Sequence, residues 1–232
     1  MTRMVIDTET CNGLESPLVY DLGLTVLNSD GSIRFEYRAI VDEIYNGMAD
    51  LMQSAHYARK LPAYNAAIAS GELEVKPLAI IHHDLYDIVK RFNVTDVWAF
   101  NAYFDRKALR NTTLTVSNGL QTHLLPYGII WRDLWHFACQ TALQSRNFYR
   151  YVIANNAYTL KGWPRTDAEI TYRYLSGDND FIESHTALDD ARIEAWILAK
   201  LLKRKTRILE TSTIKPFPNG KVRQGLNAYL KR

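Results

Sequence analysis

Residues 4–10 read Met-Val-Ile-Asp-Thr-Glu-Thr, and this short run decides how the rest of the chain is interpreted. Its three apolar residues predict a buried strand. Asp7 and Glu9 follow at the end of that strand, and because side chains alternate between the two faces of a strand, both carboxylates point the same way. Two neighbouring carboxylates repel each other unless a cation lies between them. The pair therefore predicts either a cation site or an ordinary polar turn at a strand end.

Two further strands are predicted over residues 18–27 and 33–41, where branched and aromatic residues are frequent. Ser29-Asp30-Gly31 lies between them and supplies the residues of a hairpin turn. Together with the first strand, these segments predict an antiparallel meander at the N-terminus.

After Val41 the spacing of apolar residues changes to the helical period, and it is interrupted by two short apolar runs at 97–100 and 128–131 that predict strands. Strands followed by alternating helices and strands predict an α/β fold with a mixed five-stranded sheet flanked by helices on both faces. The expected helices cover residues 49–69, 77–92, 104–110, 134–143, 166–177 and 186–207.

Composition and charge limit the class of protein. The chain has 232 residues, of which 47% are hydrophobic and 23% charged, so it can bury a large core and is not intrinsically disordered. We expect one domain over residues 1–210 and a basic tail over residues 211–232. Residues 200–232 hold ten basic residues and one acidic residue, which leaves a net charge of −6 on residues 1–199. This asymmetry predicts a polyanion held by the tail, cations held by the body, or a solvated helix end before a loose terminus.

The location of the protein is predicted from what the sequence lacks. No apolar run reaches the roughly 20 residues that span a bilayer, and no signal-type stretch opens the chain. Cys11 and Cys139 lie far apart and outside any zinc-finger spacing, so no disulfide framework is predicted. We expect a cytoplasmic protein without a membrane partner, in the host cytoplasm if a phage encodes it.

Two later segments add acidic residues to the first pair. Asp105 ends the run Asn101-Ala-Tyr-Phe-Asp105, which follows the expected strand 97–100, and taken alone it is a charge that complements a helix dipole. His185 opens the run His-Thr-Ala-Leu-Asp-Asp-Ala at the start of the last expected helix. Taken alone, this run is a capped helix start.

In this order, DTET, NAYFD and HTALDDA resemble the three motifs of the DnaQ-like 3′–5′ exonucleases of the DEDDh subgroup, which includes polymerase proofreading exonucleases and RNase T. The resemblance extends over residues 3–200, and its most specific part is His-x-Ala-x-x-Asp-Ala before an amphipathic helix. It implies an RNase H-like fold and metal-dependent release of 5′-mononucleotides from the 3′ end of a nucleic acid strand.

Matched position by position, the resemblance implies a catalytic set of five residues. Four are the acidic metal ligands and the fifth, His185, is the general base. Asp189 falls outside the family spacing, which needs five positions from the histidine to the acid, so we expect it either to be structural or to support the residues that hold the metal. The implied metal ligands are Asp7, Glu9, Asp105 and Asp190.

Neighbours of these acids are the implied substrate contacts, including an apolar wedge of the kind the family often places beside its third acid. The family usually has a glycine soon after the first glutamate, whereas Thr10-Cys11-Asn12 precede Gly13 here. The loop that receives the terminal nucleotide is therefore expected to differ in shape. The implied contacts are Thr8, Thr10, Asn101 and Phe104.

The chemistry explains why such a set is needed. Phosphodiester hydrolysis brings an anionic nucleophile to an anionic phosphate, and two divalent ions neutralise the phosphate, generate hydroxide and stabilise the leaving oxygen. Hard oxygen ligands favour Mg²⁺, with Mn²⁺ as a substitute. Histidine, with an ordinary pKa of about 6.5, can accept a proton from the attacking water at neutral pH. The expected cofactor is therefore two Mg²⁺ ions.

The substrate is expected to be single-stranded, because a duplex keeps its terminal nucleotide paired. We expect DNA first and RNA second, since the sequence does not reveal which group meets the 2′-hydroxyl. The tail is interpreted as an arm on the nucleic acid backbone, a docking peptide for a polymerase or another replication protein, or an inert terminus. Two other functions stay open: a non-catalytic nucleic-acid-binding or adaptor protein on the same fold, and a phosphodiesterase of small nucleotides.

Aromatic residues are frequent between the second and third motifs, interleaved with basic residues. We expect most of these rings to lie in the core and two or three to stack on bases of a single strand. The rings in this region include Tyr127, Trp131, Trp135, Phe137, Phe148, Tyr149, Tyr151, Tyr158, Trp163, Tyr172 and Tyr174.

Overall fold

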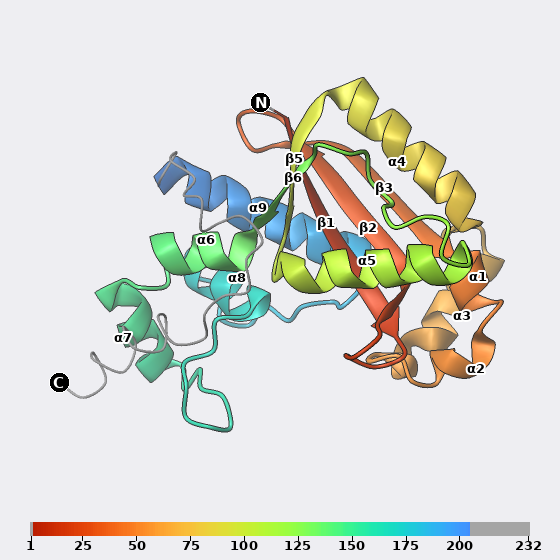
Figure 1. Cartoon of the computed structure of the whole chain (residues 1–232). Coiled ribbons are helices and arrows are strands. Elements are labelled where there is room, and N and C mark those ends of the chain that lie inside the picture. Colours follow the sequence, from red (N-terminus) through yellow and green to blue (C-terminus); the bar gives the residue numbers. More distant parts are fainter. Residues whose placement is uncertain (1, 205–232) are drawn as a thin grey trace.

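The computed structural model describes residues 2–204, which form a mixed six-stranded sheet with helices on both faces (Figure 1). The predicted tail, the domain boundary at residue 210 and the end of the last helix lie outside the described residues. The strand order is β4-β3-β2-β1-β5-β6. The strands are β1 (Thr2–Cys11), β2 (Leu18–Leu27), β3 (Ile33–Val41), β4 (Val75–Lys76), β5 (Val94–Ala99) and β6 (Ile130–Asp133).

Pairing within the sheet confirms the predicted meander. Strands β1, β2 and β3 are antiparallel, and Gly31 provides the left-handed φ of +89° in the turn between β2 and β3. Strand β5 pairs parallel to β1, and β6 parallel to β5. The prediction of five strands is wrong by one, because β4 also pairs parallel to β3. A strand of two residues has no periodicity that a sequence could reveal.

Ten helical segments are described within residues 2–204, and most of them lie where the apolar spacing predicted. The helix expected over residues 49–69 is wrong, since this stretch forms α2, η1 and α3, and α7 was not predicted. The segments are α1 (Asp42–Tyr45), α2 (Ala49–Met52), η1 (Ala58–Lys60), α3 (Leu61–Ala69), α4 (Leu78–Phe92), α5 (Ala102–Val116), α6 (Leu134–Thr141), α7 (Arg146–Ala154), α8 (Ala168–Ser176) and α9 (Ala187–Arg204). Within residues 2–204, no helix combines the length and apolar character that crossing a membrane requires.

The break between α2 and α3 has two causes. The Ser54 hydroxyl donates to the Leu51 carbonyl oxygen at 2.6 Å and accepts the backbone N–H of Asn12 at 2.9 Å, so the chain turns towards the loop after β1. Pro62 lies in the first turn of α3, where its missing N–H is tolerated only at a helix start. The chain therefore begins a new helix at Leu61.

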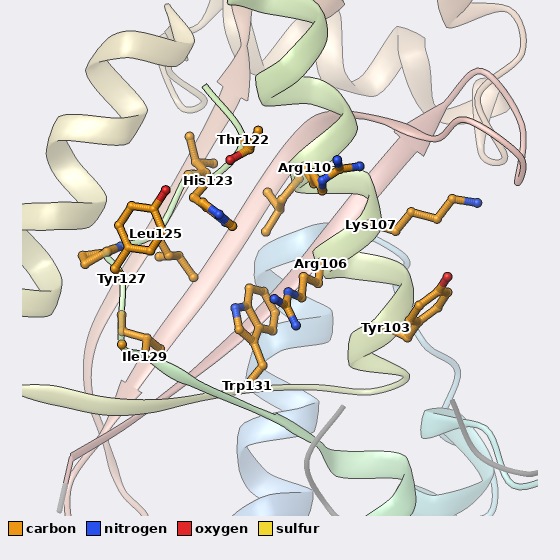
Figure 2. A pocket seen from close by; sticks show the side chains of 14 residues that line it. Tyr103, Arg106, Lys107, Arg110, Thr122, His123, Leu125, Tyr127, Ile129 and Trp131 are labelled. Atoms are coloured by element: carbon orange, nitrogen blue, oxygen red, sulfur yellow. The ribbon is translucent and has the colours of Figure 1, made fainter. Parts of the chain in front are cut away.

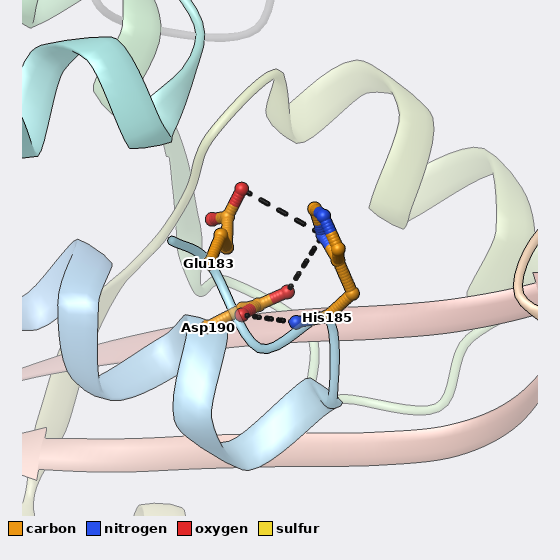
Figure 3. A group of neighbouring side chains, drawn as sticks. All are labelled: Glu183, His185 and Asp190. Carbon is orange, nitrogen blue, oxygen red and sulfur yellow. Dashed lines mark hydrogen bonds and ion pairs between the residues drawn. The ribbon is translucent and has the colours of Figure 1, made fainter. Parts of the chain in front are cut away.

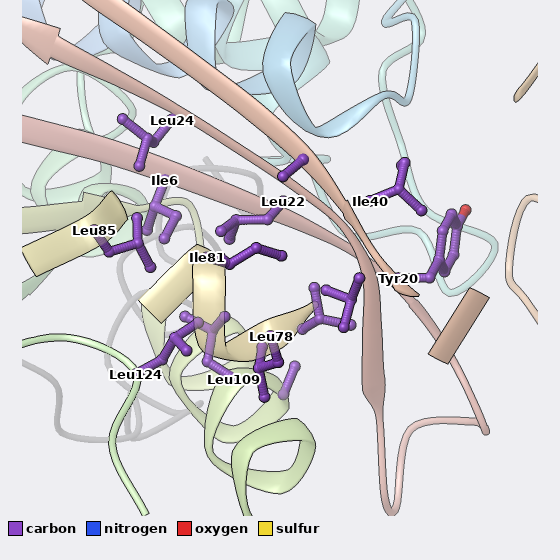
Figure 4. Packing of buried hydrophobic residues seen from close by; sticks show 14 of the residues in the cluster. Ile6, Tyr20, Leu22, Leu24, Ile40, Leu78, Ile81, Leu85, Leu109 and Leu124 are labelled. Carbon is purple, nitrogen blue, oxygen red and sulfur yellow. The ribbon is translucent and has the colours of Figure 1, made fainter. Parts of the chain in front are cut away.

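Two apolar clusters, one on each face of the sheet, hold the helices in place. Alternation along β1 sends Ile6 into one cluster and Val5 into the other. The first cluster, seen in Figure 4, packs α4 and α5 against β1 and β2, with Leu85 and Leu109 among its members. The second packs α6 and α9 around the fully buried Trp98. Both faces of β2 are covered, which explains why all ten of its residues are buried.

Helix α9 lies directly on β2 at Gly23. A β-carbon at this position would fall on the backbone atoms of Ala187 and Leu188, so no other residue allows the same approach. Gly23 is also the residue that pairs with Asp7 across the β1–β2 ladder. The start of α9 is therefore placed beside the first acidic residue of the chain.

A buried carboxylate fixes the same helix end. Asp21 is fully buried and accepts hydrogen bonds from Arg38 Nη2 at 2.7 Å and from the Tyr64 hydroxyl at 2.6 Å. It also accepts the first N–H of α9, from Ala187, at 3.2 Å. A negative charge at a helix N-terminus is stabilising, and the guanidinium group of Arg38 balances the charge of Asp21 within the chain.

We expect Gly23→Ala to lower the free energy of unfolding by about 1–3 kcal/mol, because the added methyl group pushes α9 away from β2. Chemical denaturation monitored by circular dichroism measures this. The matched control is Gly71→Asn, at an exposed turn with a φ of +76° and nothing within 4 Å of an added β-carbon. Equal losses for the two variants would contradict the proposed role of the contact.

Candidate active site

The five residues predicted as the catalytic set line one cleft of about 360 Å³. The cleft opens where β1 and β5 separate: their pairing stops at Val5 and Trp98, while β1 continues to Cys11. Asp7 and Glu9 thus lie inside β1 and not at its end, as the sequence had suggested. The cleft receives Asp7 and Glu9 from β1, Asp105 from α5, Asp190 from α9, and His185 from the segment before α9.

Asp105 is held in the first turn of α5 by the strand next to it. Thr8 points towards α5, and its hydroxyl donates to Asp105 Oδ1 at 2.8 Å. Both residues are buried. Asn101 precedes the helix in the left-handed conformation, with a φ of +70°. This turn between β5 and α5 brings Asp105 into the cleft within a few residues of the buried end of β5.

Helix α9 supplies two buried acids to the cleft, Asp190 and Glu194. They are four positions apart and therefore lie on one face of the helix. Glu194 accepts the backbone N–H of Phe100 at 3.1 Å, which ties α9 to the end of β5. Our sequence analysis missed Glu194, although its spacing from Asp190 was a signal that could have found it.

Several contacts hold His185, which lies two residues before the start of α9. Its backbone is left-handed, with a φ of +52°, and its N–H donates to Asp190 Oδ1 at 3.2 Å. The imidazole stacks on the ring of Tyr57 with centroids 4.3 Å apart and planes 14° apart. Lys60 Nζ donates to the His185 carbonyl oxygen at 2.9 Å. The segment that holds Tyr57 and Lys60 thus fixes His185 together with Asp190 of α9, and the stack on Tyr57 orients the ring.

A second acid that the sequence analysis missed, Glu183, faces the imidazole. His185 Nδ1 lies 3.7 Å from Glu183 Oε2 and 3.9 Å from Asp190 Oδ2 (Figure 3). A carboxylate at this distance stabilises positive charge on the ring. Asp189 points elsewhere, as predicted: it accepts the Thr186 hydroxyl at 2.9 Å and pairs with Arg192 at 2.8 Å.

Burial and mutual repulsion raise the pKa of the cleft carboxylates. Burial is the larger cause for Glu9, whose pKa rises to about 9, and nearby Asp190 adds to it. The pKa values of Asp105 and Asp190 rise to about 7 for the same main reason. The pKa values of Asp7 and Glu194 are also raised, by burial and then by the neighbouring acids. In the absence of cations, the cleft therefore retains protons at neutral pH.

The pKa of the His185 imidazole shifts in the opposite direction. Burial, followed by the nearby positive charge of Lys60, lowers the pKa of His185 below its ordinary value. The ring is therefore neutral at pH 7 and able to accept a proton.

The donor set fits a hard divalent cation. Ligand atoms of Asp7, Glu9 and Asp190 all lie within 4.8 Å of one another. Carboxylate oxygens are the ligands that Mg²⁺ and Mn²⁺ prefer, and like charges gathered in a buried place need a countercharge. Asp105 lies in the same cleft, with one oxygen bonded to Thr8.

Three of the four implied substrate contacts line the cleft: Thr8, Thr10 and Phe104. Asn101 is exposed at the N-cap of α5 and is not among the residues that line it. Gly13 and Leu14 of the loop after β1 also line the cleft. This is the loop in which the sequence departs from the family pattern.

Comparison with known protein families finds no family model that matches this chain. A search of curated protein sequences finds no match either. Solved structures of exonuclease I do match, and the chain spans about two fifths of their length. At 13–14% identity these matches establish the fold, which is RNase H-like as the sequence predicted.

Three of these structures show the extent of the likeness. The structure of exonuclease I reported with an account of how processivity is achieved matches with a TM-score of 0.52 and 13% identity, over 89% of this chain and 42% of that one. Escherichia coli exonuclease I in complex with a 5cy-dT13 oligonucleotide matches with a TM-score of 0.50 and 13% identity, over 89% and 41%. Exonuclease I from Methylocaldum szegediense matches with a TM-score of 0.50 and 14% identity, over 89% and 41%.

We expect the thermal stability of the protein to depend on pH, and the effect of added metal on that stability to depend on pH as well. Raised carboxylate pKa values favour folding below the unfolded pKa of about 4, and this contribution is lost as pH rises through about 7 for Asp105 and Asp190 and about 9 for Glu9. We therefore expect the melting temperature in EDTA to fall between pH 6 and pH 9. Added Mg²⁺ should raise it more at pH 8.5 than at pH 6.

Asp7→Asn removes one of the repelling charges and one oxygen ligand. We expect this variant to melt at a higher temperature than the unaltered chain in EDTA at pH 8.5, and to gain less from Mg²⁺. The control is Asp87→Asn, an exposed acid on α4. Differential scanning calorimetry measures both effects, and an unchanged Mg²⁺ gain in Asp7→Asn would contradict the cation site.

Proposed function

We propose that this chain is a metal-dependent 3′–5′ exonuclease of the DEDDh subgroup that releases 5′-mononucleotides from single-stranded nucleic acid. The observation that carries the proposal is the convergence of Asp7, Glu9, Asp105, His185 and Asp190 on one cleft. These residues come from three segments that lie far apart between residues 7 and 190 of the sequence. Their pKa shifts are of the kind that catalytic sites show.

The four carboxylates are the groups that would hold two Mg²⁺ ions, or Mn²⁺ as a substitute. When bound, such ions neutralise the phosphate charge and lower the pKa of an attacking water. The chain supplies the orientation: the Thr8 hydroxyl fixes Asp105, and the N–H of His185 fixes Asp190. Only deprotonated carboxylates act as ligands, so cation binding would displace the protons that the raised pKa values retain.

His185 would act as the general base. Its lowered pKa keeps the ring neutral at pH 7, so it can take a proton from the attacking water. The stack on Tyr57 orients the ring, and the bond from Lys60 holds the backbone of His185. Once the ring is protonated, Glu183 and Asp190 lie close enough to stabilise the positive charge.

The substrate we propose is a single strand with a free 3′ end, DNA first and RNA second. Phe104 lines the cleft beside Asp105 and would pack against the terminal base. A structure of the same fold, exonuclease I of Escherichia coli, is a complex with a 5cy-dT13 oligonucleotide, which supports DNA as the first substrate to test.

A time course with 5′-labelled single-stranded DNA and RNA of one sequence tests the activity. With Mg²⁺, we expect a ladder that shortens from the 3′ end, and we expect EDTA or Asp7→Ala to abolish it. The sugar that shortens faster identifies the preferred substrate. Intact oligonucleotide in every lane, from folded protein that still retards the label in a binding gel, would favour the adaptor function instead.

His185→Ala should separate chemistry from binding. We expect the single-turnover rate on saturating oligonucleotide to fall about 10²–10⁴-fold, because the proton acceptor is lost. The Kd for the same oligonucleotide should change little, since the carboxylates remain. His83→Ala, at an exposed position on α4, is the matched control. A near-normal single-turnover rate for His185→Ala would rule out the general-base role.

A further inference from the structure

A second hollow, of about 460 Å³, lies between α5 and the segment that leads into β6 (Figure 2). We name it the basic groove. Within residues 2–204, no acidic side chain lines it. Its polar and aromatic lining is Tyr103, Arg106, Lys107 and Arg110 from α5, with Thr122, His123, Tyr127 and Trp131 from the other side.

The positive charge of the basic groove is uncompensated. Arg106 and Arg110 lie four positions apart on α5, and within residues 2–204 their side chains make neither an ion pair nor a hydrogen bond. By contrast, Arg38 binds Asp21 at 2.7 Å and Arg192 binds Glu36 at 2.6 Å. Two free guanidinium groups one helical turn apart suit the phosphates of a strand.

The aromatic rings beside these charges are unusually exposed. Tyr103 is 51% exposed and Tyr127 is 82% exposed. Trp131 is half-buried at the floor of the groove. A positively charged groove with accessible rings is the combination that binds single strands without sequence preference, since bases stack on the rings and phosphates meet the charges.

The basic groove borders the acidic cleft. Lys107 lines the groove, and its Nζ donates to the carbonyl oxygen of Leu14 at 3.1 Å, a residue that lines the cleft. Helix α5 also connects them directly, because Asp105 in the cleft and Arg110 in the groove are separated by about 7.5 Å along the helix axis. A strand that ends in the cleft can therefore continue into the groove.

We propose that the basic groove binds the part of a single-stranded nucleic acid that lies 5′ to the nucleotides in the acidic cleft. The phosphates meet Arg106 and Arg110, and bases stack on Tyr103 and Tyr127. The inference rests on the proposed function in one respect, since it places the 3′ end of the strand in the cleft.

Equilibrium binding in EDTA tests the groove without hydrolysis. The full chain is titrated against fluorescein-labelled oligothymidine of 20 nucleotides, and anisotropy gives the Kd. We expect Arg106→Gln/Arg110→Gln to weaken binding about 10-fold or more and to reduce the slope of log K against log salt by about 1.4, for two lost phosphate contacts. Tyr127→Ala should weaken binding about 5-fold or more through lost stacking.

The matched control removes two charges at the end of α4, outside both sites. Lys90→Gln/Arg91→Gln carries the same change in net charge on another helix, and we expect its Kd to match that of the unaltered chain. Equal losses for the two double variants would reduce the effect to net charge and overturn the proposal. Tighter binding of a phosphoserine peptide than of the oligonucleotide, lost in Arg106→Gln/Arg110→Gln, would assign the groove to a protein partner and would also overturn it.

Hydrolysis of a dinucleotide with Mg²⁺ separates the groove from the cleft. Its one phosphate is the scissile phosphate and must lie in the cleft, which leaves no phosphate for Arg106 and Arg110, so Arg106→Gln/Arg110→Gln should cleave it at the rate of the unaltered chain. An equal loss on short and long substrates would place the two arginines in the cleft and contradict the proposal. If no hydrolysis occurs but the variant-specific loss of strand binding persists, the exonuclease proposal fails and the groove stands as a binding site.

Discussion

The close contact between α9 and β2 is the constraint on which the site depends. Gly23, the residue without a side chain at that contact, pairs with Asp7 across the ladder, and Asp21, which accepts the first N–H of α9, pairs with Glu9. These two residue pairs of the β1–β2 ladder therefore hold the acids of β1 and also fix the helix that brings Asp190 into the cleft. Fold and site are not separable here, because the residues that position the helix lie directly opposite the residues it must meet.

Two buried acidic regions in this protein differ in how their charge is balanced. Asp21 is buried next to Arg38 and the Tyr64 hydroxyl, so its negative charge is neutralised within the chain. The cleft collects several carboxylates, and Lys60 is the cation that lowers the pKa of Glu9 among them. A compensated buried charge stays ionised without a counterion from solution, whereas an uncompensated group needs protons or cations from solution. This difference distinguishes the supporting acid from those we propose as ligands.

The sequence predicted what depends on local period and on ordered motifs. The meander, the long helices and the grouping of the five motif residues in one cleft all follow from such signals, although the catalytic roles of those residues stay predictions. Glu183 was missed because a single acid in a charged segment has no local signature, whereas Glu194 could have been found from its spacing of four positions from Asp190. The helix over residues 49–69 was wrong because Ser54 bonds to a distant loop. Long-range contacts of this kind leave no trace in apolar spacing.

Helix α5 carries Asp105 in its first turn and Arg110 further along, on a single uninterrupted helix. A single helix that carries a proposed metal ligand and a proposed phosphate-binding arginine would hold the two groups at a fixed spacing. A strand long enough to reach from Asp105 to Arg110 would be held firmly, and a shorter strand would be held loosely. Digestion of a long strand would then end in a residual fragment a few nucleotides long, whose length is set by the helix and not by the base sequence.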